Sequence, residues 1–123
     1  KRNKRLDFLM EKNEWTNYTF ITAWNPKSEI RDTHINKKAN IDLLRDLLAI
    51  DSYIFPALGD PVNKNWIGEE SWLAFNLKIK KARELMIKYD QYAIVYGDRN
   101  QEAKLILNEK YLNAKRDILQ QVK

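Results

Sequence analysis

Hydrophobic residues along the chain follow two spacings, an alternating one that is typical of strands and a three-to-four-residue one that is typical of helices. Short runs rich in aromatic and β-branched residues predict strands. They lie at 15–25, 52–58, 71–75, 93–96 and 103–107. The spacing of Ile41, Leu44 and Leu48 predicts a helix over about 35–50, and Thr33 or Asn36 is the expected N-cap.

Two more segments have helical spacing. The first follows Asn76, its expected cap, and has apolar residues at Ile79, Ala82 and Tyr89. Basic residues occupy its other face, which makes 78–88 a predicted basic helix. The second follows Asn108, also an expected cap, and its apolar stripe would continue to the last residues of the chain. Residues 1–14 are mostly charged and predict a basic N-terminal arm or a short helix.

The order of these elements predicts an α+β fold. The first six, counted from the strand at 15–25, follow the β-α-β-β-α-β order of ferredoxin-like domains. We therefore expect a mostly antiparallel sheet with the two middle helices on one face, plus an extra strand and a C-terminal helix. At 123 residues the chain has the length of one domain, which we assign to 15–123.

Polar residues gather where three of the strands start or stop. The run Tyr18–Pro26 ends abruptly because Pro26 has no N–H to continue a ladder. This leaves Thr22, Trp24 and Asn25 at a strand end. The clusters Glu69-Glu70-Ser71 and Asp90-Gln91 occupy comparable places in the sequence. Together the three clusters are the candidate site.

Charge and composition narrow the class of partner. The net charge is +5, and residues 78–123 carry all of it, with 11 Lys and Arg against 6 Asp and Glu. Such a field attracts phosphates, although a solvated, slightly basic surface is the favoured explanation of it. The chain has no cysteine and no apolar run long enough to span a membrane, which favours the cytoplasm.

The spaced clusters resemble a known family. Thr22-Ala-Trp-Asn-Pro26, Asn40, Gly59, Glu69-Glu70-Ser71 and Tyr89-Asp-Gln-Tyr-Ala-Ile-Val95 are similar to DUF3293, a family of small bacterial and phage-type domains of unknown function. This chain has Trp24 where the family often has Phe or Tyr, and Tyr89-Asp-Gln where Phe-Gly-Gln is common. The resemblance implies a shared fold and a shared pocket, but no known reaction.

The first functional hypothesis is a non-catalytic binding domain for a phosphorylated or nucleotide-like ligand. Amides and carboxylates would recognise polar groups, an indole ring would stack, and Arg31 would attract phosphate. The candidate ligand-binding residues are Thr22, Trp24, Asn25, Arg31, Trp66, Glu69, Glu70, Ser71 and Gln91. We assign no catalytic residue, cofactor or metal. Structural roles compete with each assignment: Asn25 can form a turn, Gln91 can cap a helix, and the tryptophans can be core.

Two other classes of function stay open. A protein-interaction module, such as a phage or bacterial inhibitor of a host enzyme, would use the basic helix 78–88, and nucleic acid could bind the same face. A hydrolase would use Glu70 as general acid or base, but the sequence identifies no second catalytic group. The P-loop and dinucleotide-binding glycine motifs are absent, and His34 is the sole histidine.

Overall fold

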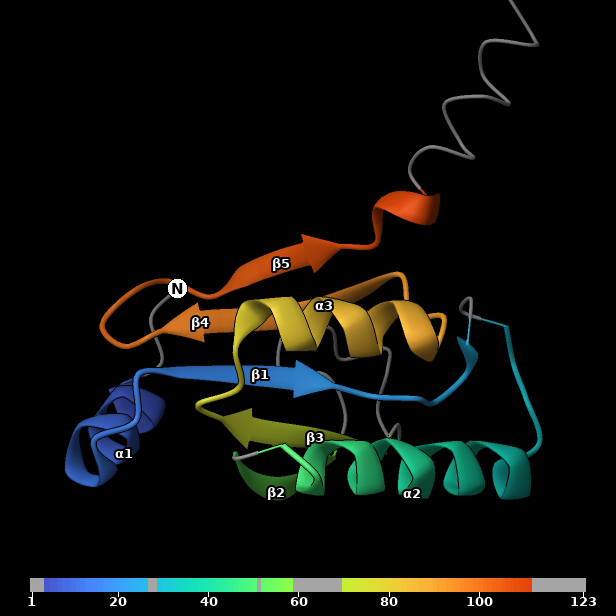
Figure 1. Ribbon diagram of the computed structural model, residues 1–123, viewed down its shortest axis with the longest axis horizontal. Helices are drawn as coiled ribbons and strands as arrows, with labels where there is room; N and C mark the ends of the chain where they lie inside the picture. Colours follow the sequence, from blue (N-terminus) through green and yellow to red (C-terminus); the bar gives the residue numbers. More distant parts are fainter. Residues whose placement is uncertain (1–3, 27–28, 51, 59–69, 112–123) are drawn as a thin grey trace, which may run out of the picture.

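The structure is a computed structural model that describes residues 4–26, 29–50, 52–58 and 70–111. Three helices and five strands lie along this part of the chain (Figure 1). In chain order they are α1 (Lys4–Asn13), β1 (Asn17–Ile21), α2 (Thr33–Leu48), β2 (Tyr53–Leu58), β3 (Glu70–Phe75), α3 (Ile79–Lys88), β4 (Ala93–Asp98) and β5 (Lys104–Leu107). The predicted α+β class is confirmed. No described helix has the length and apolar character needed to cross a membrane.

The strands form one five-stranded sheet in the order β2-β3-β1-β4-β5, and every neighbouring pair is antiparallel. The central strand is β1, in which Thr19 lies opposite Ala74 of β3 on one side and Tyr96 of β4 on the other. Because both neighbours run against β1, its C-terminal end lies beside their N-terminal ends. The end of β1 and the starts of β3 and β4 therefore meet at one end of the sheet (Figure 1).

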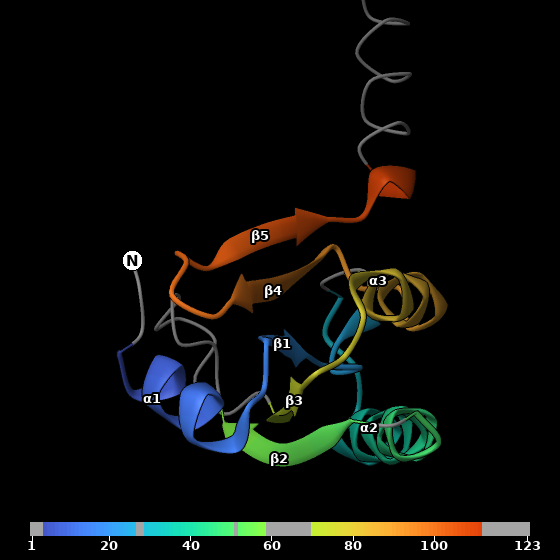
Figure 2. The same cartoon turned by 60° about the vertical axis from the view of Figure 1, so that its left-hand side comes forward.

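The helices α2 and α3 cover one face of the sheet, as Figure 2 shows in an end-on view. Alternate strand residues point toward them, which follows from the two-residue period of a strand. The core on this face contains Ile21, Ala74 and Ile94 from the sheet, Leu43 and Leu47 from α2, and Ala82 and Met86 from α3. Burial of these apolar groups is the main force that holds the two helices against the sheet.

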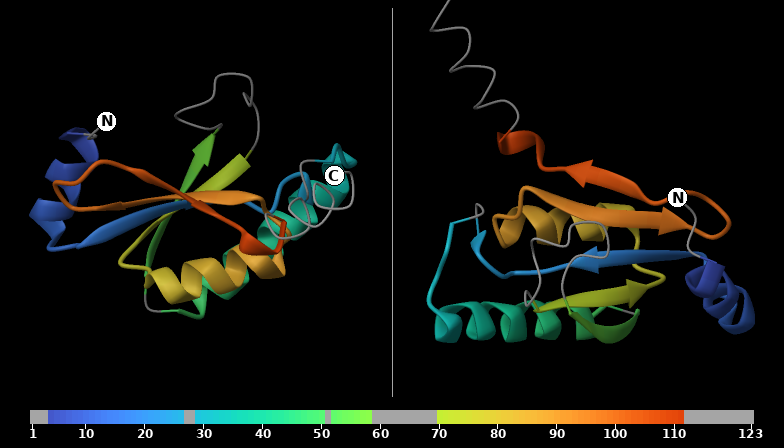
Figure 3. Two further views of the ribbon diagram at one scale, coloured as in Figure 1. Left: turned by 90° about the horizontal axis from the view of Figure 1, so that it is seen from above. Right: turned by 180° about the vertical axis from the view of Figure 1, so that it is seen from behind.

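The other face of the sheet carries a second, aromatic core. The ring of Trp15 stacks on Phe75 at 4.4 Å between centroids and contacts Tyr53 at 5.0 Å. Buried residues of α1 join this cluster from the end of the sheet opposite the start of α2 (Figure 3). The carboxylate of Asp7 accepts a hydrogen bond of 2.9 Å from the N–H of Asn100, which ties α1 to the turn between β4 and β5.

The structure corrects two of the expected helix caps. The N-cap of α2 is Asp32, whose carboxylate accepts from the N–H of His34 at 2.8 Å, and neither Thr33 nor Asn36 has this role. Asn76 does not cap α3, which begins after Lys78 without a side-chain cap. Asn76 has a φ of 61° and accepts from the N–H of Thr16 instead, at 2.8 Å.

The expected final helix lies mostly outside the described residues. At its start the side-chain oxygen of Asn108 accepts from the N–H of Lys110 at 3.1 Å, which is the geometry of an N-cap.

The aromatic face requires a glycine opposite Tyr18. Gly97 pairs with Tyr18 across β1 and β4, and the phenol ring lies over its backbone. A Cβ at Gly97 would lie 2.4 Å from the nearest ring carbon, well inside van der Waals contact. Because Tyr18 is buried, its ring has little room to move away.

We expect Gly97→Ala to lower the free energy of unfolding by about 1–3 kcal/mol, because the added methyl group displaces a packed ring. Urea denaturation measures this change. In a Tyr18→Ala background the ring is gone, so the same substitution should be close to neutral. Equal effects in the two backgrounds would show that the ring is not the cause.

Candidate functional site

The three polar clusters predicted from the sequence meet at one end of the sheet. The hydroxyl of Thr22, just beyond β1, donates a hydrogen bond of 2.6 Å to the backbone carbonyl of Glu70 at the start of β3. The side-chain amide of Gln91, before β4, donates to the carbonyl of Trp24 at 3.3 Å. Each of the other two clusters is therefore bonded directly to the segment that follows β1.

One buried amide on α2 connects the ends of β1 and β3. The side-chain oxygen of Asn40 accepts from the N–H of Ala23 at 2.8 Å and from the hydroxyl of Thr22 at 3.5 Å. Its nitrogen donates to the carbonyl of Glu70 at 2.7 Å. The indole N–H of Trp72 donates to the backbone carbonyl of the same asparagine at 3.0 Å. Asn40 is only 2% exposed, so water cannot replace these bonds readily.

A second buried amide, one helical turn earlier, holds Asn25. The side chain of Asn36 accepts from the N–H of Asn25 at 2.9 Å and donates to its side-chain oxygen at 2.8 Å. That same oxygen also accepts from the N–H of Arg31 at 3.0 Å. The backbone of Asn25 has a φ of 45°, a left-handed conformation that asparagine tolerates better than most residues. Its side chain therefore organises the loop, as the structural alternative predicts.

Gln91 also has a structural role. Its side-chain nitrogen donates to the carbonyl of Tyr89 at 3.2 Å as well as to Trp24, so it bonds the backbone where α3 ends. Its own backbone carbonyl accepts from the side chain of Asn108 at 3.0 Å. The residue is buried, and these contacts join the end of β5 to the candidate site.

Only some of the predicted site residues that the structure describes have side chains that remain available to a ligand. The ring of Trp24 is half-buried, and the exposed Arg31 forms an ion pair of 2.7 Å with Glu29. The carboxylate of Glu70 is exposed, and no hydrogen bond or ion pair joins it to another described residue. The hydroxyl of Ser71 makes one long bond, of 3.4 Å, to a carbonyl of β2. The candidates Trp66 and Glu69 lie outside the described residues.

Several residues at this end of the sheet were not predicted as site residues. Asn36 and Asn40 fall on the same buried stripe of α2 as the apolar residues Leu43 and Leu47. Two amides in an otherwise apolar stripe were the sequence signal that could have identified them. The other missed feature is a pair of tyrosine rings.

The rings of Tyr92 and Tyr111 meet edge to face at 4.6 Å. The Tyr111 hydroxyl donates to Asp90 at 2.9 Å. Burial, with a smaller effect of this hydrogen bond, raises the pKa of Tyr111 to about 12. The phenol therefore stays protonated near neutral pH and acts here as a hydrogen-bond donor.

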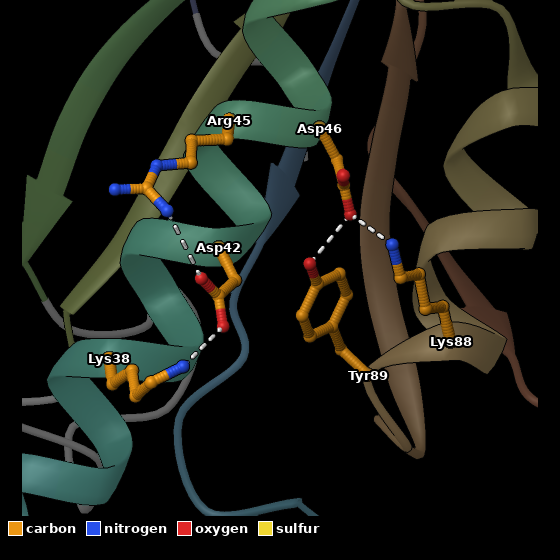
Figure 4. A network of polar contacts seen from close by, with 6 residues as sticks. All are labelled: Lys38, Asp42, Arg45, Asp46, Lys88 and Tyr89. Carbon is orange, nitrogen blue, oxygen red and sulfur yellow. Dashed lines mark hydrogen bonds and ion pairs between the residues drawn. The ribbon is translucent and has the colours of Figure 1, made fainter.

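A separate polar network joins α2 to α3 (Figure 4). Asp46 accepts from Lys88 at 2.8 Å and from the hydroxyl of Tyr89 at 2.6 Å. The hydrogen bond from Lys88 is the largest of the effects that lower the pKa of Asp46. Burial, followed by the bond to Asp46, raises the pKa of Tyr89. Both partners of the carboxylate donate to it, so the network clamps two helices together.

Comparison with known proteins identifies the family. The model of a family described as "Protein of unknown function (DUF3293)" matches residues 21–94, which include all three clusters. The chain belongs to the DUF3293 family. This confirms the resemblance inferred from the spaced motifs. The match starts at the last residue of β1 and ends early in β4, so the part that defines DUF3293 here includes the buried amides of α2.

One solved structure is similar to this DUF3293 protein at a distance. It is a phage SAM lyase in complex with S-methyl-5′-thioadenosine, with 14% sequence identity and a TM-score of 0.41. The similarity covers 77% of this chain and 90% of the lyase chain. No curated protein matches the sequence.

We expect Asn40→Ala to lower the free energy of unfolding by roughly 1–3 kcal/mol, because it leaves the buried N–H of Ala23 without its partner and removes one of the two donors to the carbonyl of Glu70. Thermal or urea denaturation measures the loss. Lys37→Ala, on the exposed side of the same helix, is the matched control and should change stability by less than about 0.5 kcal/mol. An equally small effect of Asn40→Ala would contradict the structural role of this amide.

The Asp46 clamp should make stability depend on pH in acid. Because the pKa of Asp46 is lower in the folded protein, the unfolded chain binds more protons as the pH falls. The stabilisation is complete above the unfolded pKa of about 3.9 and is lost as the pH falls through the folded value. Asp46→Asn should therefore lose stability at neutral pH and show a flatter fall in acid. Parallel curves of denaturation midpoint against pH for the two proteins would contradict this role.

Proposed function

We propose that this DUF3293 protein is a small binding domain for a phosphorylated or nucleotide-like ligand, held at the end of the sheet where the three clusters meet. The observation that carries the proposal is this convergence: Thr22 bonds to the carbonyl of Glu70, and Gln91 bonds to the carbonyl of Trp24.

We also propose that β1 to β4, with α2 and α3, are a ferredoxin-like core. Its support is the order β2-β3-β1-β4 with all pairs antiparallel.

The groups still available at this end suit such a ligand. The guanidinium of Arg31 is exposed and can exchange its contact with Glu29 for a phosphate, with which it forms paired hydrogen bonds. The half-buried ring of Trp24 offers a stacking surface for a base. The exposed carboxylate of Glu70 can accept hydrogen bonds from ligand hydroxyl groups. The buried amides support the proposal indirectly, since they hold the backbone that carries these three side chains.

Binding explains the described groups better than hydrolysis does. A hydrolase would need a second acid, base or nucleophile within reach of Glu70. Among the described residues, none contacts that carboxylate. The amides of Asn25 and Gln91 are used to hold the loop, so they preorganise a site and do not take part in proton transfer.

The first test is native mass spectrometry of the full chain purified from cells, followed by titration with adenine nucleotides and nucleoside monophosphates. We expect an added mass that Arg31→Ala removes and Glu70→Gln weakens, because these changes delete phosphate and hydroxyl contacts. Arg45→Ala is the control, since this exposed arginine lies in the last turn of α2, away from the site. An unliganded protein that binds none of these compounds, or equal loss with Arg45→Ala, would overturn the proposal.

A further inference from the structure

The strand β5 is an edge of the sheet, and its outer side is unpaired among the described residues (Figure 1). The opposite edge, β2, contains Pro56, which has no N–H and so interrupts pairing with a further strand. The described strand β5, Lys104–Leu107, has no proline. Of the two edges, it is the one that can accept a continuous backbone ladder.

Hydrogen-bond alternation shows which backbone groups of β5 face outward. In an antiparallel pair, every second residue bonds to the neighbouring strand. The N–H of Asn108 donates to the carbonyl of Tyr92 at 2.8 Å, and the N–H of Arg99 donates to Thr16 at 2.9 Å. Even-numbered residues of β4 therefore bond to β5, and odd-numbered ones bond to β1. The N–H and C=O groups of Leu105 and Leu107 point away from β4, toward an incoming chain.

A groove runs along this edge. It has a volume of about 500 Å³ and lies between α3 and β5. Met86 and Ile106 form its apolar floor beside the core, while Ile87, Leu105 and Leu107 line it and are strongly exposed. Leu105 is 64% exposed, the most of the three. An incoming strand would cover this surface.

The charge around the groove is mainly positive. Arg83 and Lys110 line it, and Lys104 begins the strand, whereas Glu109 is the single acidic lining residue. Lys110 is partly neutralised by Asp90 at 3.6 Å. Elsewhere on α3 the cations are partly neutralised, since Lys81 pairs with Glu84 and Lys88 pairs with Asp46. No ion pair joins Arg83 or Lys104 to another described residue. Arg83, the cation of α3 that lines the groove, therefore lies beside the unpaired edge without an ion pair to a described residue.

We propose that β5 and this groove bind an extended acidic segment of a partner protein, which adds to the sheet as a further strand. Backbone pairing with Leu105 and Leu107 would supply affinity, as in other strand-addition complexes. Side chains of the segment would alternate between the two faces of the sheet. Acidic ones would reach Arg83 and Lys104 on the helix side, and apolar ones would cover the exposed leucines on the other side.

The basic residues around the groove also argue against a second copy of this chain as the partner that binds β5. Two β5 strands paired edge to edge would bring Arg83, Lys104 and Lys110 of both copies together, and like charges facing each other oppose association. An acidic segment has the complementary charge. This surface lies beside β5, so it is separate from the ligand site proposed at the end of β1.

The probe is a synthetic peptide of about eight residues that alternates glutamate with valine, long enough to pass the four residues of β5. Its binding to the full chain is measured by fluorescence anisotropy. We expect saturable binding that weakens as salt is raised from about 0.05 M to about 0.5 M. Methylating every second backbone nitrogen of the peptide on its pairing side should abolish binding, whatever the protein variant. A glutamine-for-glutamate peptide should bind at least about tenfold more weakly.

Two substitutions test the surface itself. Leu105→Pro removes an outward N–H without removing a bond to β4, and we expect at least about a tenfold loss of affinity. Leu105→Ala keeps that N–H and should lose less. Arg83→Glu should weaken binding about tenfold, whereas Lys37→Glu, the matched charge reversal on α2, should leave it unchanged.

Three results would overturn the proposal. One is the absence of peptide binding at about 1 mM, which is weaker than any specific strand addition should be. Another is equal binding of the methylated and unmethylated peptides. The third is a dimer of the unliganded protein that Leu105→Pro dissociates, because the edge would then belong to a second copy.

Discussion

The side-chain amide of Asn40 determines how the central strand ends. At the point where β1 ends, the backbone N–H of Ala23 and the carbonyl of Glu70 both bond to the side chain of Asn40, which α2 buries against the sheet. The hydroxyl of Thr22 is a second donor to that carbonyl. A buried polar group without a partner costs more than a formed hydrogen bond contributes, so the helix, β1 and β3 can take only one relative position here.

The rest of the site follows from that constraint. Once the backbone after β1 is held, Asn36 can reach Asn25 and Gln91 can reach Trp24. The residues that looked most like ligand contacts are therefore largely part of the scaffold. The side chains of Arg31 and Glu70 stay exposed, and the ligand that we propose would contact them on this preorganised backbone. The β5 edge is tied to this scaffold through Asn108 and Gln91, but it presents backbone groups and apolar side chains and so has a different chemistry.

The sequence predicted the elements well because each has a strong local signal. The stripe that includes Leu44 and Leu48 predicted α2 within two residues at each end. The first strand was predicted too long, because β1 ends at Ile21 and not at residue 25, where side-chain amides take over the backbone bonds. The caps were predicted wrongly. Asn76 is a good cap by composition, but the folded chain uses its oxygen for Thr16, which lies next to it only after β1 and β3 pair. Whether the Asn76 side chain accepts from an N–H at the start of α3 or from the N–H of Thr16 depends on which of them the folded chain brings close.

By itself, then, the sequence determined the α+β class, the helical and extended segments, the family and the three clusters at strand ends. These follow from periodicity, turn chemistry and spacing, which are local properties of the chain. Only the tertiary structure decided which polar atoms of those clusters are consumed by the fold, since Asn25, Gln91 and Asn40 find partners far away in sequence. It also decided that Leu105 presents an open edge, because strand order and hydrogen-bond alternation exist only once the sheet is assembled.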